Sequence, residues 1–167
     1  MAFALPDGPN MVTHTSHTQT EVSGVIAAKN PPCVLVIDDD PRSLELMTIV
    51  LGKAGYRVVT ASDGHAGLEC IAMERPDVVL VDLLMPGIDG YEFCRRVRAG
   101  PGLADLPLVL FTAMASTEVQ LQAGRSGANS VMMKPFDRAE LLDCLARLQD
   151  GMRGGSRPGS DGNGSSD

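Results

Sequence analysis

The sequence predicts an α/β fold, a doubly wound three-layer sandwich in which five βα units build a five-stranded parallel sheet. Three observations predict it. Five short apolar runs alternate with five segments whose apolar residues recur at helical spacing. The apolar runs are hydrophobic at nearly every position, as expected of parallel strands covered on both faces. Clusters of Pro, Gly and Asp separate the segments, where turns and helix ends belong.

The first two βα units lie before residue 74. A strand is expected over residues 33–37, and Pro41 suits the first turn of the helix that follows and that Gly55 ends. A second strand is expected over 56–60 and a second helix over 64–73. The apolar residues expected to face the sheet from these helices are Leu44, Met47, Val50, Leu51, Ala66, Leu68 and Ile71.

The last three units begin with the most apolar strand, expected over 77–81. A loop rich in Pro, Gly and Asp over 85–90 leads into a helix that carries Tyr91, Phe93, Cys94 and Val97. The remaining elements are a strand over 108–111, a helix over 117–123, a strand over 130–133, and a closing helix with Leu141, Cys144, Leu145 and Leu148.

The fourth helix has a thin apolar face, Val119 and Ala123, and two glycines, Gly124 and Gly127, weaken its C-terminal end. Two interpretations stay open. The segment is either a marginal helix or a mobile switch surface, because moving elements come from regions of low stability.

The chain length of 167 residues suits a single domain. We expect the folded unit to span 33–150, with a flexible N-terminal arm over 1–32. The tail over 151–167 is nearly all Gly, Ser, Asp, Arg and Pro, and is expected to be disordered because it buries too little apolar surface. The pattern leaves no segment for a second or output domain.

The charge balance argues against a nucleic-acid partner. The formal net charge is -7 and the pI is near 4.9, which disfavours binding to polyanions. The basic cluster Arg95, Arg96 and Arg98 is therefore expected on a solvated helix face. No apolar run approaches the roughly 20 residues that a membrane span needs, and the N-terminus lacks the features of a signal peptide. We expect a cytoplasmic protein without a membrane partner.

The four cysteines and three histidines show no spacing typical of metal ligands or of disulfides. The cysteines, Cys33, Cys70, Cys94 and Cys144, sit within apolar patterns and are expected to pack as small hydrophobic residues in a reducing compartment.

Polar residues follow four of the five strands. Because the carboxyl ends of parallel strands meet at one edge of the sheet, these residues are expected to converge there. They are Asp38, Asp39 and Asp40 after the first strand, Asp82 after the third, Thr112 after the fourth and Lys134 after the fifth.

This combination indicates phosphoryl chemistry. Clustered carboxylates attract a cation, and an all-oxygen site suits Mg²⁺. A carboxylate can attack phosphorus and form an aspartyl-phosphate. Lys134, Thr112 and Mg²⁺ could then stabilise the charge on the phosphoryl oxygens.

Each residue also has a structural explanation. Asp40 is expected to be the N-cap of the first helix, which leaves Asp38 and Asp39 for the metal. Asp82 alone could be a turn residue, Thr112 a satisfied hydroxyl and Lys134 a surface lysine. These explanations require several independent coincidences at one edge of the sheet, so the functional interpretation is preferred.

Four segments, residues 34–41, 82–90, 111–113 and 134–136, resemble the receiver domain of bacterial response regulators, whose CheY-like members have the flavodoxin-like (βα)5 fold. The resemblance covers the whole expected folded unit. It implies a two-component phosphorelay protein, a phospho-accepting switch that promotes its own phosphorylation and dephosphorylation and is not otherwise an enzyme.

By this resemblance Asp82 is the phospho-acceptor. Asp38, Asp39, Asp82 and the backbone carbonyl of Leu84 hold Mg²⁺, Thr112 shifts toward the phosphoryl group, and Lys134 pairs with it. The Lys134–Pro135 bond is expected to be cis. One departure concerns the position three residues before the lysine, where the family usually carries Tyr or Phe and this sequence has Val131.

The resemblance implies a sensor histidine kinase or histidine phosphotransferase as phosphoryl donor and a protein as the downstream target. Homodimerisation stays open. Two rivals also remain: a haloacid-dehalogenase-like phosphohydrolase, whose nucleophile lies after the first strand, and a pseudo-receiver that only docks partners.

Overall fold

The computed structural model describes residues 30–114 and 116–153, which form five strands and five helices in strict alternation. In chain order they are β1 (Cys33–Ile37), α1 (Pro41–Lys53), β2 (Arg57–Ala61), α2 (Gly64–Glu74), β3 (Val78–Asp82), α3 (Gly90–Ala99), β4 (Leu108–Thr112), α4 (Thr117–Ser126), β5 (Ser130–Met133) and α5 (Arg138–Arg153).

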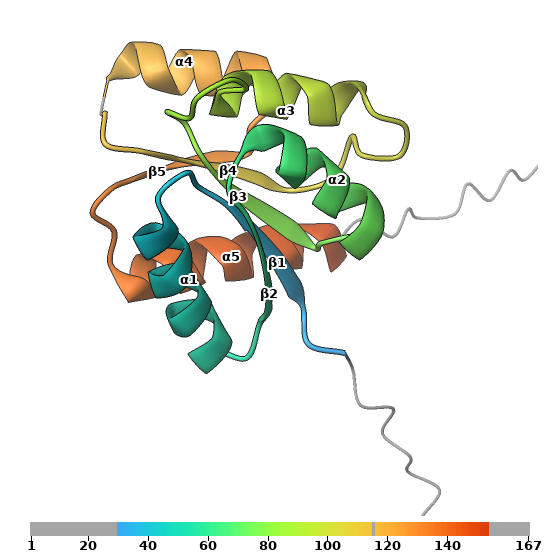
Figure 1. Ribbon diagram of the computed structural model, residues 1–167, viewed down its shortest axis with the longest axis vertical. Helices are drawn as coiled ribbons and strands as arrows, with labels where there is room; N and C mark the ends of the chain where they lie inside the picture. Colours follow the sequence, from blue (N-terminus) through green and yellow to red (C-terminus); the bar gives the residue numbers. More distant parts are fainter. Residues whose placement is uncertain (1–29, 115, 154–167) are drawn as a thin grey trace, which may run out of the picture.

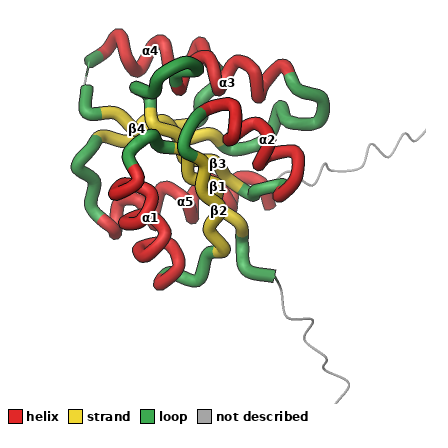
Figure 2. The backbone as a smooth tube through the Cα atoms, in the orientation of Figure 1, coloured by secondary structure: helices red, strands yellow, loops and turns green. Residues whose placement is uncertain are grey.

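All strand pairs are parallel, and the strand order is β2-β1-β3-β4-β5. Helices α2, α3 and α4 cover one face of the sheet, while α1 and α5 cover the other (Figures 1 and 2). The predicted doubly wound three-layer sandwich is confirmed. The strand order reverses between β1 and β3, which is the place where ligands of such folds bind.

Each face of the sheet has its own core. One core contains Ile37, Val81 and Phe93 beneath α2, α3 and α4, and the other contains Met47, Leu80 and Leu145 beneath α1 and α5. Every residue of β1, β3 and β4 is buried. The three central strands are thus rigidly packed up to their last residues, which is where the polar residues begin.

The helices begin at side-chain caps, which explains where the chain leaves each strand-end loop. Asp40 accepts a hydrogen bond from the Arg42 N–H (3.1 Å), confirming its predicted role as the cap of α1. Asp63, Asp89 and Ser116 cap α2, α3 and α4 in the same way.

The boundaries differ from the sequence expectation at several ends. Asp82 and Thr112 are the last residues of β3 and β4 and not the first residues after them. Helix α4 continues to Ser126, beyond the predicted end at residue 123, because Gly127 supplies a left-handed C-cap (φ 88°). Helix α5 runs to Arg153, past the expected domain boundary at residue 150. The rest of the predicted arm and tail, residues 1–29 and 154–167, lies outside the described residues.

The cysteines are free, and Cys33, Cys94 and Cys144 are buried, as their apolar surroundings in the sequence suggested. Burial raises the pKa of the Cys94 thiol to about 11. Within residues 30–114 and 116–153, no helix is long and apolar enough to cross a membrane.

Candidate functional site

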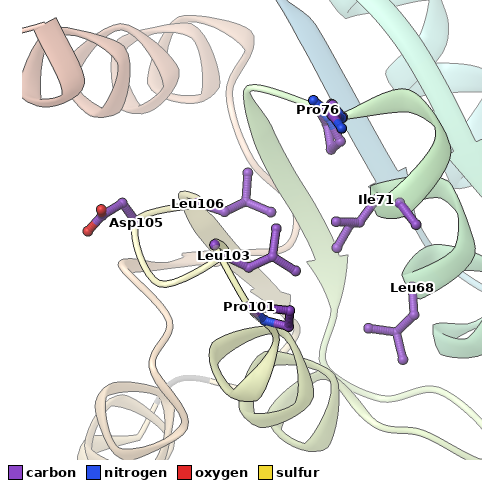
Figure 3. A pocket seen from close by; sticks show the side chains of 10 residues that line it. Leu68, Ile71, Pro76, Pro101, Leu103, Asp105 and Leu106 are labelled. Atoms are coloured by element: carbon purple, nitrogen blue, oxygen red, sulfur yellow. The ribbon is translucent and has the colours of Figure 1, made fainter.

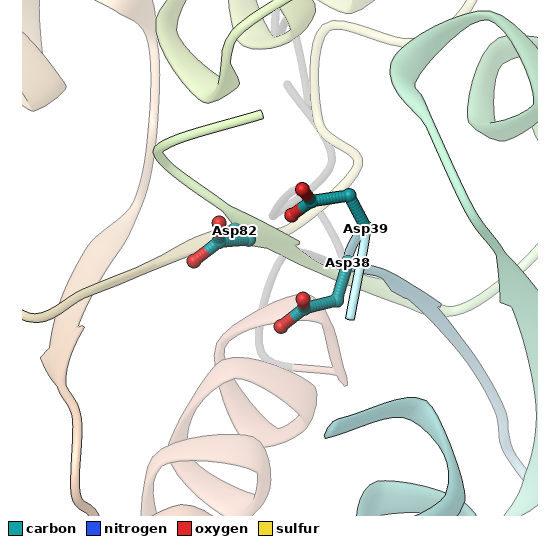
Figure 4. A group of neighbouring side chains, drawn as sticks. All are labelled: Asp38, Asp39 and Asp82. Carbon is teal, nitrogen blue, oxygen red and sulfur yellow. The ribbon is translucent and has the colours of Figure 1, made fainter. Parts of the chain in front are cut away.

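Three carboxylates meet at the carboxyl ends of β1 and β3. Oxygen atoms of Asp38, Asp39 and Asp82 all lie within 4.8 Å of one another. Figure 4 shows the three side chains beside one another where these two neighbouring strands end. The sequence-based expectation that these residues converge is correct for all three.

Asp38 and Asp39 differ in their surroundings although they are adjacent in the chain. Asp38 is buried, and its Oδ1 accepts a hydrogen bond from the Asp40 N–H (2.9 Å). Asp39 is exposed. The first carboxylate is thus fixed by the start of α1, and the second is open to solvent and to a ligand.

Lys134, which follows the edge strand β5, reaches this cluster across the end of β4. Its Nζ donates hydrogen bonds to Asp38 Oδ2 (2.7 Å) and to Asp82 Oδ1 (2.8 Å). The Lys134–Pro135 peptide bond is cis, as expected. The ring of Phe136 packs on that of Phe111 in β4, with centroids 5.0 Å apart, which attaches the loop after the lysine to the core.

Thr112 lies at the end of β4, between β3 and β5. Its side chain is 1% exposed, and its hydroxyl accepts a hydrogen bond from the Met114 N–H (3.0 Å). The Thr112 carbonyl accepts from the Lys134 N–H (2.8 Å), so the two predicted residues are coupled through the backbone. Within the described residues, the Thr112 hydroxyl makes no hydrogen bond to the acidic cluster.

The electrostatics of the cluster are set by burial. Burial is the main cause that raises the pKa of Asp82; the hydrogen bond and charge of Lys134 oppose the shift, and the charges of Asp38 and Asp39 add to it. Burial lowers the pKa of Lys134, but the hydrogen bonds to Asp38 and Asp82 and the negative charges of these two carboxylates together raise it. The surroundings therefore favour the charged form of Lys134 and disfavour the charged form of Asp82.

The donor set fits a hard divalent cation such as Mg²⁺. Three side chains present carboxylate oxygens only, and Asp39 is open to solvent, which leaves room for the water ligands that Mg²⁺ retains. A cation there would offset the like charges that raise the pKa of Asp82.

Two exposed apolar residues follow site residues closely in the chain. Leu84, two residues after Asp82, is 61% exposed, and Met114, two residues after Thr112, is 52% exposed. Val131, at the position where the family usually carries an aromatic residue, is half-buried against the core beneath α2, α3 and α4.

Sequence reasoning missed a second feature, a hollow of about 600 Å³ between α2 and the loop that joins α3 to β4. Its lining includes Leu68, Ile71, Leu103 and Leu106 (Figure 3). None of the predicted site residues lines it. No signal in the sequence marks it, because Leu68 and Ile71 have the spacing of ordinary core residues.

Comparisons with known proteins agree with this geometry. The family model described as response regulator receiver domain matches residues 34–146. The DNA-binding dual master transcriptional regulator RpaA of Synechocystis is 39% identical over 111 residues, which are 66% of this chain and 46% of RpaA. The chain thus spans about half the length of the curated relatives it matches.

Two solved structures illustrate the structural likeness. The chemotaxis protein CheY4 of Vibrio cholerae has a TM-score of 0.68 and 32% identity, covering 71% of this chain and 98% of that chain. The receiver domain of the sensor histidine kinase PA1611 of Pseudomonas aeruginosa has a TM-score of 0.67 and 30% identity, covering 72% and 98%, and carries a magnesium ion coordinated in its active-site cleft.

The family match, the strand order and the acidic cluster lead to one conclusion. This chain belongs to the family of response regulator receiver domains, the phospho-accepting switch domains of two-component signalling.

Proposed function

We propose that Asp82 accepts a phosphoryl group from a histidine kinase or histidine phosphotransferase, and that the phosphorylated chain signals through contact with another protein. The observation that carries the proposal is the position of Lys134. Its ammonium lies 2.8 Å from Asp82 and 2.7 Å from Asp38, next to the solvent-exposed Asp39. A nucleophilic carboxylate, a fixed cation and ligands for a second cation thus share one place.

The transfer is a displacement at phosphorus. A carboxylate oxygen of Asp82 forms the new P–O bond, and the bond from phosphorus to the donor's imidazole nitrogen breaks, leaving the electron pair on that nitrogen. Asp82 is the last residue of β3, and all residues of this strand are buried. The nucleophile is therefore held in a fixed position.

Asp38, Asp39, Asp82 and the Leu84 carbonyl are the proposed ligands of Mg²⁺. The ion would supply positive charge to the phosphoryl oxygens. Two features support this assignment: the all-carboxylate cluster and the magnesium ion of the PA1611 receiver domain, which shares 30% of its residues with this chain.

Thr112 and Lys134 bind the phosphoryl group once it is attached to Asp82. Lys134 neutralises its charge, and the Thr112 hydroxyl, which accepts a hydrogen bond from the Met114 N–H, donates its own proton to a phosphoryl oxygen. Because Met114 lies in the loop that leads to α4, movement of the Thr112 side chain toward the phosphoryl group would change the support of that loop. The response is proposed to spread through α4 and β5 to a surface that a partner protein recognises, in the cytoplasm.

The test is phosphorylation with acetyl phosphate and Mg²⁺, measured by intact-protein mass spectrometry and peptide mapping. We expect one phosphoryl group on Asp82, none in Asp82→Asn, and little in wild type when EDTA removes the metal. The matched control is Asp105→Asn, which removes a carboxylate that lines the hollow at the other end of the molecule and should react like wild type. Labelling that persists in Asp82→Asn would overturn the assignment.

A further inference from the structure

Arg98 on α3 binds two separate connections of the chain, the α3–β4 loop and the segment between α4 and β5. Its Nη1 donates to the carbonyls of Leu103 (3.0 Å) and Leu106 (2.8 Å), in the loop that leads to β4. Its Nε donates to the Gly127 carbonyl (2.9 Å) at the C-cap of α4, and its Nη2 donates to Asn129 Oδ1 (2.8 Å). One guanidinium therefore fixes the end of α4 to α3 and to the start of β4.

The position of Arg98 corrects a sequence expectation. Arg95 and Arg96 do lie on a solvated face, where both pair with Glu92. Arg98 is half-buried, and all four of its acceptors are uncharged carbonyl or amide oxygens. Burial lowers its pKa, although the guanidinium remains charged. Such charge-assisted bonds are stronger than neutral ones.

The two residues after α4 that Arg98 binds, Gly127 and Asn129, are themselves firmly placed. Asn129 pairs with Leu108, the first residue of β4: its N–H donates to the Leu108 carbonyl, and its Oδ1 accepts from the Leu108 N–H, both at 2.8 Å. Gly127 has a φ of 88°, and a Cβ there would lie 2.6 Å from Arg98 Cγ. The arginine stem packs directly against the backbone at the C-cap of α4.

The rest of α4 has few buried side chains. Only Val119, Ala123 and Ser126 of this helix are buried, all small side chains. Toward its N-terminal end, Ser116 caps the helix and Val119 packs in the core, and the side-chain hydrogen bond from α3 runs from the Tyr91 hydroxyl to the Val119 carbonyl at 3.5 Å, the limit of such a bond. The remaining α4 side chains point to solvent.

We propose that Arg98 is a positioning residue that anchors the C-terminal end of α4, so that α4 opens from its N-terminal end and pivots at Gly127. Helix propensity alone predicts the opposite order, because Gly124 and Gly127 would let the C-terminal end open first. The end that opens is the one that follows Thr112 in the chain. The role of this opening in signalling rests on the proposed function, but the anchoring of α4 by Arg98 does not.

Amide hydrogen exchange of the full chain, followed by NMR without metal or phosphoryl donor, tests the proposal. We expect amides of residues 124–128 to exchange at least tenfold more slowly than those of residues 120–122. Arg98→Met should remove this difference. Measured relative to the amides of β3, the protection of α4 amides should fall only at the C-terminal end of α4. A uniform loss across the protein would indicate general destabilisation and would count against the anchor.

The control is Arg96→Met on the same helix, which removes an exposed ion pair and should leave the α4 pattern unchanged. If Arg98→Met does not fold, Arg98→Lys serves, because a single ammonium cannot reproduce the fork of donors and should reduce the difference. Equal protection at both ends of α4 in the wild type, or equal effects of the Arg96 and Arg98 variants, overturns the proposal. Because no phosphoryl donor is present, neither result depends on Asp82.

Discussion

The Nζ atom of Lys134 lies almost equally close to two carboxylates of different strands, 2.7 Å from Asp38 Oδ2 and 2.8 Å from Asp82 Oδ1. The lysine side chain is 29% exposed and both aspartates are buried. A cation that is shared in this way stabilises two buried negative charges at once. It also links β5 to β1 and β3 by side-chain contact alone, since β4 lies between them.

Replacing Lys134 by Ala should therefore affect both stability and chemistry. We expect the free energy of unfolding to fall by about 1–3 kcal/mol, because buried carboxylates lose their counter-charge. Phosphorylation by acetyl phosphate should slow by about 100-fold, since a fixed charge on the phosphoryl oxygens is lost. Urea unfolding and mass spectrometry measure the two effects. Lys53→Ala removes an exposed lysine of α1 and should change neither; wild-type reactivity of Lys134→Ala would contradict the role.

The ionisation of Asp82 predicts how stability depends on pH in metal-free protein. Since folding raises the pKa of Asp82, the folded state binds this proton more tightly than the unfolded chain does. The ionised carboxylate of Asp82 therefore lowers the free energy of unfolding at pH values above its pKa in the folded protein. This loss disappears at pH values below its pKa in the unfolded chain, about 4.

Asp82→Asn should accordingly melt at a higher temperature than wild type at neutral pH, and the difference should shrink on acidification. Thermal unfolding followed by circular dichroism across this range measures it. A difference that grows toward low pH would show that the sign is wrong.

The phosphorylated form should be long-lived for this family. Hydrolysis needs a water molecule in line with the scissile bond. The apolar side chains of Leu84 and Met114, which follow Asp82 and Thr112 by two residues, cannot hold such a water by hydrogen bonding. We expect the double variant Leu84→Asn, Met114→Glu to lose its phosphoryl group at least several-fold faster than wild type. The decay is followed by mass spectrometry after removal of acetyl phosphate. Leu121→Asn, an equally exposed apolar position on α4, is the control. Equal decay of the double variant and wild type would refute the shielding by these side chains.

Gly90, the first residue of α3, lies against the backbone of the acceptor. A Cβ there would be 2.8 Å from the Asp82 carbonyl oxygen and 2.9 Å from Leu83 Cα. We expect Gly90→Ala to destabilise the fold by about 1–3 kcal/mol, because backbone atoms cannot yield as a flexible side chain does. Gly124→Ala has open space around its new methyl group and should stabilise by about 0.5–1 kcal/mol. Denaturant unfolding of both variants checks the pair; equal effects would contradict it.

Much of the fold could be predicted because its strands carry their own signal. The run over 130–133 coincides with β5, and β1 matches its predicted bounds, since both are apolar segments between polar ends. The positions of the polar candidate residues could be predicted for a related reason. Asp38, Asp82 and Lys134 stand next to such runs, and the parallel arrangement then brings strand ends together.

The role of Arg98 could not be predicted in this way. Its four acceptors include three main-chain carbonyls, and every residue has such a carbonyl, so nothing in the sequence marks those of Leu103, Leu106 and Gly127. The length of α4 was underestimated for another reason: the prediction ended the helix before Gly124, whereas Gly127 is the glycine that supplies the C-cap, so the helix runs to Ser126.

The order of the strands has a consequence for the choice of side chain at position 134. Strands β3 and β5 are second neighbours, so their axes lie about 9–10 Å apart. Only a long side chain can cross the end of β4 from the edge strand to Asp82, and the four-carbon stem of lysine does so. Its reach is useful only in one register, in which Met133 pairs with Thr112. A slip of β5 by one residue would bring methionine or proline to this edge of the sheet in place of the ammonium. The length of one side chain and the register of one short edge strand together determine whether the acidic cluster has its counter-charge.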